Sequence, residues 1–315
     1  MALALEHRLH PPGPHRVPRP PAALRRRGVA HVVVLVGGAA AFGVLLERAT
    51  SDRPTAHVLA TAAATWAVLG GTSLEREAHA VAGLLERRDL PAARQRLTHL
   101  VGRDPSRLDE DEVARAVVES VAENTSDAVV APLVLGAVLG VPGLVGHRAA
   151  NTLDAMVGLR SERYADFGWA SARLDDLLAL PGSRLSALLA VGLGHDHVGA
   201  WRTWRRDAPG HPSPNAGPVE AAFAGALGVR LGGRNTYGDR VEHRHLLGDG
   251  PPPRVTDVRR ATALARRVDA GAILLAAMVA GLGRRRAASG LPLSPAGRPR
   301  RSGCRPRGRR RAPRR

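Results

Sequence analysis

The sequence predicts an all-α, polytopic membrane helical bundle with a soluble helical lobe between its second and third spans. Four apolar stretches, rich in Gly and Ala, carry almost no charge, and no β alternation or internal repeat is visible. They cover residues 29–46, 55–70, 128–146 and 268–283 and are 16 to 19 residues long. A bilayer crossing needs roughly 17–25 residues, and small residues favour close packing of membrane helices. Buried helices of a soluble bundle are the alternative interpretation.

The net charge of +18 arises entirely at the two ends of the chain. Residues 1–28 hold six Arg and one Glu, and residues 284–315 hold thirteen Arg and no acid, so residues 29–283 are balanced. Both ends are too poor in apolar residues to build a core. We expect 1–28 to be an unstructured or out-of-frame segment and 284–315 an unstructured Arg-rich tail. Because residues 29–283 carry no net charge, the sequence argues against a nucleic-acid partner.

Residue usage excludes several chemistries. The chain contains no Lys, which removes the Walker lysine, the Schiff-base lysine and a lysine general base. Its single cysteine, Cys304, excludes intrachain disulfides, and thiolate zinc and iron–sulfur sites are excluded as well.

The first apolar stretch sets the expected orientation. Arg25, Arg26 and Arg27 precede it, and positive residues stay on the cytoplasmic side. We therefore expect a multi-pass protein of the cell membrane, in contact with lipid, with a cytoplasmic N-terminus. The later apolar stretch at 177–194 contains Pro181 and Arg184, which favours a half-span or interfacial helix over a full crossing.

Between the second and third stretches, two capping boxes predict the helices of the lobe. Thr72 with Glu75 opens the first helix, and Asp109 with Glu112 opens a second that runs to about Asn124. The second helix carries Glu119, Glu123 and Asp127 at four-residue spacing, immediately before an apolar stretch. Carboxylates on one stripe repel one another unless a cation lies among them. Their hard oxygens suit Mg²⁺, and a solvated helix face is the alternative.

A second polar cluster follows the third apolar stretch. It combines Arg side chains, which bind phosphates or carboxylates, with carboxylates and an amide. Its members are Arg148, Asn151, Asp154, Arg160, Arg173, Asp175 and Asp176. A salt-bridged amphipathic loop is the alternative on chemistry alone. Further on, the turn 211–218 is either an anion cradle or an ordinary turn.

Four strings, in these clusters and in the turn 211–218, resemble the adenosylcobinamide-phosphate synthase family, the membrane-bound CobD/CbiB family of cobalamin biosynthesis. They are Glu119–Asp127 (ESVAENTSD), Asn151–Gly158 (NTLDAMVG), Asp166–Asp176 (DFGWASARLDD) and Ser213–Gly217 (SPNAG). The resemblance runs in order from about Gly28 to Gly283. It implies a membrane synthase domain over residues 29–283.

The resemblance implies an ATP- and Mg²⁺-dependent amide ligase that joins adenosylcobyric acid to aminopropanol or its phosphate. Other enzymes of the corrinoid pathway are expected as further partners. From the resemblance and the residue types together, we expect Asp127 and Asp154, assisted by Glu123, to bind the metal ion. We expect Asp175 or Asp176 to orient or deprotonate the amine. The expected substrate- and ATP-binding residues are Glu119, Glu123, Asn124, Arg148, Asn151, Arg160, Arg173 and Asn215. The alternative function is a polytopic membrane protein that binds or transports a small solute without turnover.

A shared site requires the two polar clusters to meet, although residues 128–146 separate them. A straight helix of that length would place them on opposite faces of the membrane. Because the stretch contains Pro132, Gly136, Gly140, Pro142 and Gly143, we expect a broken or re-entrant segment that returns both clusters to the cytoplasmic side.

Overall fold

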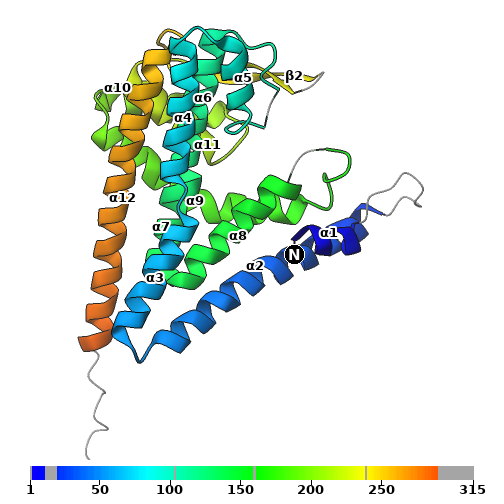
Figure 1. The fold of residues 1–315 in the computed structure, drawn as a ribbon, viewed down its shortest axis with the longest axis vertical. Helices are drawn as coiled ribbons and strands as arrows, with labels where there is room; N and C mark the ends of the chain where they lie inside the picture. Colours follow the sequence, from blue (N-terminus) through cyan, green and yellow to red (C-terminus); the bar gives the residue numbers. More distant parts are fainter. Residues whose placement is uncertain (1, 11–19, 103, 159–160, 238–239, 290–315) are drawn as a thin grey trace, which may run out of the picture.

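The computed structural model describes residues 2–10, 20–102, 104–158, 161–237 and 240–289, and these residues are mostly helical (Figure 1). Three helices in the described residues are long and apolar enough to cross a membrane: Pro21–Thr50, Glu110–Leu139 and Trp169–Leu193. The prediction of an all-α polytopic membrane bundle is confirmed.

The elements follow one another with short connections. In chain order they are α1 (Ala2–Leu9), α2 (Pro21–Thr50), α3 (Pro54–Val68), α4 (Gly71–Glu86), α5 (Leu90–Leu97), α6 (Glu110–Thr125), the π-helical turn η1 (Ser126–Val130), α7 (Ala131–Leu139), α8 (Val141–Val157), α9 (Trp169–Leu193), α10 (His197–Asp207), the 3₁₀ turn η2 (Ala208–Gly210), α11 (Ala216–Leu227), β1 (Leu231–Tyr237), β2 (Arg240–Leu247) and α12 (Val255–Ser289).

The molecule has a helical lobe at one end and an apolar helical part at the other (Figure 1). The lobe contains α4, α5, α6, α10, α11 and the two strands, whereas α2, α3, α7 and α8 extend away from it. The long helix α12 runs along the lobe and beyond it, and it packs against α4, α6, α7 and α9. Exposed apolar side chains cover the helices of the second part, including Phe42, Leu59 and Leu274. This surface is the one that lipid would cover.

The lobe is held by a continuous apolar core. Fully buried Val113, Val117 and Val121 of α6 belong to the same cluster as Phe223 of α11 and Val258 of α12. The predicted capping box at the start of α6 is confirmed, because the Asp109 side chain accepts a hydrogen bond from the Glu112 N–H and the Glu112 side chain accepts one from the Asp109 N–H. The other predicted box is wrong. Helix α4 begins at Gly71, one residue before Thr72, with no side-chain cap.

The four predicted spans fall in different kinds of element in the structure. Residues 29–46 lie inside the 30-residue helix α2, and 268–283 form part of α12. Residues 55–70 fall mostly in α3, which has only 15 residues. Residues 177–193 belong to the 25-residue helix α9, which continues through Pro181, and its length and composition favour a full crossing over the expected half-span or interfacial helix.

Residues 128–146 form a helical hairpin, as the broken-segment prediction required. The chain turns back at Gly140, whose φ of +72° is a left-handed conformation that suits glycine, and α8 then returns against α7. The Glu47 side chain of α2 accepts a hydrogen bond of 2.8 Å from the Val141 N–H at the start of α8. The segment 128–146 is therefore not a single crossing, and both of its ends lie on the same side of the hairpin (Figure 1).

Two features differ from the sequence expectations. Strands β1 and β2 pair antiparallel, so the expectation of no β structure is wrong; their short, Gly- and Arg-rich sequence shows little alternation of apolar residues. The segment 1–28 contains helix α1 and the first turns of α2 instead of being unstructured. At the other end, α12 continues to Ser289, past the expected boundary at 284, and the rest of the tail lies outside the described residues.

Helix α1 is fixed by a buried acidic side chain. Glu6 accepts hydrogen bonds of 2.8 Å from both the Arg163 guanidinium and the Tyr164 hydroxyl. Burial opposes ionisation of Glu6, but these two donors lower its pKa below the ordinary value. The contact of Glu6 with Arg163 and Tyr164 could not be predicted from the sequence, where Glu6 is a single acidic residue in a Pro- and Arg-rich segment.

Candidate active site

Acidic side chains from three helical segments meet where α6 continues through η1 into α7. Glu123 lies near the end of α6, and Asp127 lies in the π-helical turn η1. Helix α8 supplies Asp154, and the start of α9 supplies Asp175 and Asp176. We call these five residues the acidic cluster. Because π turns occur frequently at functional sites, the position of Asp127 supports a functional interpretation of the cluster.

The members of the acidic cluster interact electrostatically across the helices. Asp127 is within range of Glu123, Asp154 and Asp175, and Asp154 is within range of Asp176. The Asn151 side chain of α8 forms a hydrogen bond with Asp175. The helical hairpin thus brings together the two polar clusters that are separated by 128–146 in the sequence.

The acidic cluster extends from the surface into the protein. Glu123 is exposed, whereas Asp175 is only 9% exposed. Within the described residues, Oδ1 of Asp154 and Oδ1 of Asp175 are buried and have no hydrogen-bond partner. Buried carboxylate oxygens without partners are costly, and a cation would relieve that cost. Hard oxygen donors of this kind fit Mg²⁺.

The side chains are not arranged as a finished metal site. Among the residues that the structure describes, no group of three or more His, Cys, Asp or Glu side chains is close enough together to hold a metal ion. The metal ligands expected from the sequence, Glu123, Asp127 and Asp154, therefore stay a prediction.

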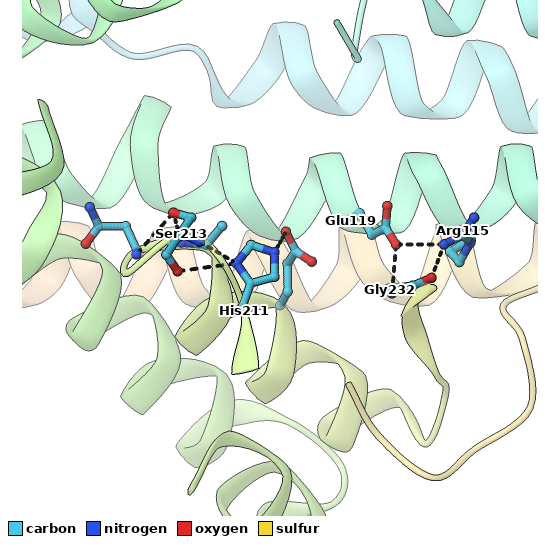
Figure 2. Close-up of polar contacts among 8 residues, drawn as sticks. Arg115, Glu119, His211, Ser213 and Gly232 are labelled. Carbon is cyan, nitrogen blue, oxygen red and sulfur yellow. Dashed lines mark hydrogen bonds and ion pairs between the residues drawn. The ribbon is translucent and has the colours of Figure 1, made fainter. Parts of the chain in front are cut away.

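Glu119, expected in the substrate site, lies against the β-hairpin. Its carboxylate accepts a hydrogen bond of 2.9 Å from the Gly232 N–H and lies 3.6 Å from the Arg115 guanidinium, which donates to the Gly232 carbonyl (Figure 2). Arg115 and Glu119 are both nearly buried. Arg115 and Glu119 therefore bind β1 to α6. Glu119 thus has a different role from Glu123 and Asp127, and the three carboxylates do not form one site.

The two further asparagines bond to the helices around them. Asn124 donates to the Ser120 carbonyl and hydroxyl on its own helix. Asn215 donates to the Asp176 carbonyl at 2.8 Å and accepts from Ser183 and Arg184, so it ties the start of α11 to α9 behind the acidic cluster. These contacts occupy the amides that we expected to bind substrate.

The turn 211–218 satisfies its own backbone groups. The Ser213 hydroxyl accepts hydrogen bonds from the Asn215 and Ala216 N–H groups. His211 lies beside Ser213 within this turn (Figure 2). The turn is an ordinary one, and no anion is needed to complete it.

The expected phosphate-binding arginines are dispersed. Arg148 lines an apolar cavity with Leu35 and Met156, and Arg173 is exposed on α9. Neither forms a hydrogen bond or ion pair within the described part of the chain. Arg160 lies outside the described residues.

The sequence interpretation passed over Glu220 and Arg244. Both line a cavity of about 120 Å³ together with Glu119, Ser120 and Glu123, next to the acidic cluster. Glu220 is 1% exposed and lies 3.8 Å from the ring of His211. A lone carboxylate in the otherwise apolar helix α11 was a signal that could have identified it.

The fold and this arrangement define a class: a polytopic helical membrane protein with an acidic site beside its lobe. Comparison with known proteins gives the family. The chain matches the family model described as CobD/Cbib protein over residues 2–265, and it belongs to that family. The match includes α1, and it ends within α12.

Relatives support the same assignment over most of their length. The chain is 52% identical over 259 residues to a protein of Mycobacterium tuberculosis named cobalamin biosynthesis protein CobD, which covers 81% of this chain and 82% of the relative. Proteins of the same name are 45% identical in Chromobacterium violaceum, over 85% and 83% of the two chains, and 40% identical in Rhizobium meliloti, over 86% and 82%. No solved structure matches this chain.

Proposed function

We propose that this protein is an ATP-dependent amide ligase of cobalamin biosynthesis that joins adenosylcobyric acid to aminopropanol or to its phosphate. Membership of the CobD/CbiB family supports a role in cobalamin biosynthesis. The observation that carries the proposal is the convergence of the motif carboxylates Asp127, Asp154 and Asp175 across the α7–α8 hairpin.

The proposed reaction forms an amide in two steps. A carboxylate oxygen of the corrinoid attacks the γ-phosphorus of ATP, the bond to the leaving ADP breaks, and an acyl phosphate forms. The amine nitrogen then attacks the acyl carbon, inorganic phosphate leaves, and the nitrogen loses a proton. Activation is required because an amide does not form spontaneously from a carboxylate and an amine in water. The site must therefore hold phosphates, position an amine and accept one proton.

The chain's own groups suit these tasks. Glu123, Asp127 and Asp154 would hold Mg²⁺, which supplies charge screening of the phosphates when bound. Asp175 is held in place by Asn151 and is buried, so it can accept the amine proton away from bulk water. Asp176 lies beside it and is positioned through its backbone by Asn215. Arg148, Arg160 and Arg173 remain the proposed phosphate-binding residues.

The test is ATP-dependent amide formation by membranes that contain the chain, with complementation of a strain blocked at cobinamide formation. Asp127→Asn and Asp175→Asn should each lower the rate by at least about 10²-fold, because each removes a charge or a proton acceptor from the site. Asp111→Asn is the matched control. Asp111 lies exposed on α6, near the start of the same helix.

Two results would contradict the proposal. One is amide formation by the native chain that does not depend on ATP. The other is solute uptake into vesicles with no amide product, which would favour the alternative function of a carrier without turnover. Equal rates in Asp127→Asn, Asp175→Asn and the control would show that the acidic cluster is not the reaction site.

A further inference from the structure

A separate cleft of about 610 Å³ lies beside α10, between α9 and the turn 211–218. This volume is in the range of small-molecule sites. Two arginines and two tryptophans, Arg184, Arg205, Trp201 and Trp204, line the cleft together with four prolines, and no Asp or Glu is among its lining residues. The cleft is thus cationic and aromatic, in contrast to the acidic cluster.

The aromatic side chains offer a stacking surface. The rings of Trp201 and Trp204 lie 5.4 Å apart between centroids and almost perpendicular, at 82°. Trp201 is 47% exposed, so a ligand can reach its ring. The Arg205 guanidinium lies 5.7 Å from the centre of the Trp201 ring. A ligand with a planar ring and a separate negatively charged group could place the ring against the indole and the charge at the guanidinium.

The arginines are available for an anion. Arg184 uses Nη1 to hold the Ser183 hydroxyl, the Pro214 carbonyl and the Asn215 side chain. Its other nitrogens make no hydrogen bond within the described residues. Arg205 lies over the Trp201 ring and makes no hydrogen bond or ion pair within the described residues, whereas the neighbouring Arg206 is bound to Asp207 and Asp249.

The wall of the cleft is held firmly. Asp207 accepts hydrogen bonds from Arg206 and from the Gly248 N–H at 2.8 Å, which ties the end of α10 to the loop after β2. The bonds from Arg206 lower the pKa of Asp207, so this carboxylate stays charged at neutral pH. Four proline rings also line the cleft and restrict the backbone there. A preformed cleft needs little ordering when a ligand binds.

The cleft is joined to the acidic cluster through Asn215. This residue accepts from Arg184 and donates to the Asp176 carbonyl. Arg184 follows Asp176 on α9 by about 12 Å along the helix axis. The ribose and triphosphate of one nucleotide can span such a distance.

We propose that this cleft binds a purine nucleoside triphosphate, with the base against Trp201 and Trp204 and phosphate oxygens at Arg205 and Arg184. The inference rests on the proposed function, which requires ATP, and it assigns the nucleotide to residues outside the acidic cluster.

The test is equilibrium binding of ATP to the purified full chain in lipid nanodiscs. Trp201→Leu and Arg205→Gln should each raise the Kd for ATP by about tenfold, the loss expected for one stacked base or one phosphate contact. Arg202→Gln is the matched control, because Arg202 is exposed on the same helix and does not line the cleft. Thermal unfolding of each variant checks that the fold is kept, and Arg205→Gln, a surface change, is the variant expected to fold normally.

The outcomes separate the two proposals. An unchanged Kd for ATP in both variants overturns the inference, as does a raised KM for the corrinoid with normal ATP binding, or weaker partition into lipid vesicles with normal ATP binding. In those cases ATP-dependent amide synthesis by the native chain would still support the proposed function. Cleft-dependent ATP binding without amide synthesis would support the inference and contradict the proposed function.

Discussion

At the scale of single residues, the position of Asp154 depends on a glycine one helical turn further on. Gly158 ends α8, and a methyl group on its Cα would lie 1.7 Å from Oδ1 of Asp154. A side chain at position 158 would therefore displace that carboxyl group. The glycine that closes the string Asn151–Gly158 is thus explained by contact with the acidic cluster.

We predict that Gly158→Ala lowers the rate of amide formation by about 10²-fold, because a displacement near 1 Å of a catalytic group has an effect of that size. The chain should still insert into membranes. The measurement is ATP-dependent product formation at matched protein levels. Gly192→Ala is the control, since Cβ at position 192 of α9 meets no atom within 4 Å. Normal activity of Gly158→Ala would show that the reaction does not depend on this position of the Asp154 carboxyl group.

At the scale of elements, the α7–α8 hairpin decides whether a shared site exists. Its turn at Gly140 is closed by the hydrogen bond between Glu47 and the Val141 N–H, so α2 fixes the depth that the hairpin reaches. The polar ends of the hairpin return to the side where the lobe lies (Figure 1). Non-helical backbone at this depth is tolerable only when protein surrounds it, and α2 and α9 pack against α8.

The topology can be measured by cysteine labelling in intact cells, in a Cys304→Ser background. Ser106 in the lobe, Ser161 after α8 and Ser51 in the turn between α2 and α3 are all exposed. We expect Ser106→Cys and Ser161→Cys to resist an impermeant reagent until the cells are opened, and Ser51→Cys to react from outside. Opposite accessibility of positions 106 and 161 would be incompatible with a shared site and with most of the residue roles proposed above.

At the scale of the whole molecule, most of the excess positive charge lies in the C-terminal segment 284–315, which holds thirteen Arg and no acid. The acidic cluster and the cleft lie within residues 29–283, where 27 Arg balance 27 acidic residues. Helix α12 contributes to the core of the lobe through Val258 and Val268 and continues among exposed apolar residues.

Deletion of residues 290–315 should therefore leave both carbonate-resistant membrane association and amide formation unchanged, because the deletion begins after α12 ends at Ser289. Membranes washed with carbonate and assayed for product provide the measurement. The full chain serves as the reference. A deletion that remained in the membrane but lost activity would give the Arg-rich tail a part in the reaction.

The sequence by itself determined the helical class, the membrane character and the family. Apolar stretches and capping residues act locally, so the span within α2 and the N-cap of α6 at Asp109 could be predicted from them, whereas the length of the apolar helix α9 was missed. The sequence also identified the motif carboxylates Asp127, Asp154, Asp175 and Asp176, because their positions within the family-like strings can be read without a structure.

Only the tertiary structure decided which of these side chains meet. Four-residue spacing placed Glu119 with Glu123 and Asp127, yet Glu119 bonds to Gly232, more than a hundred residues away. The cleft of Trp201, Arg205 and Arg184 joins residues from two helices and a turn, and no local pattern marks it. The physical reason is that side-chain contacts depend on how helices pack, and packing is fixed by long-range contacts such as the hydrogen bond from the Val141 N–H to Glu47.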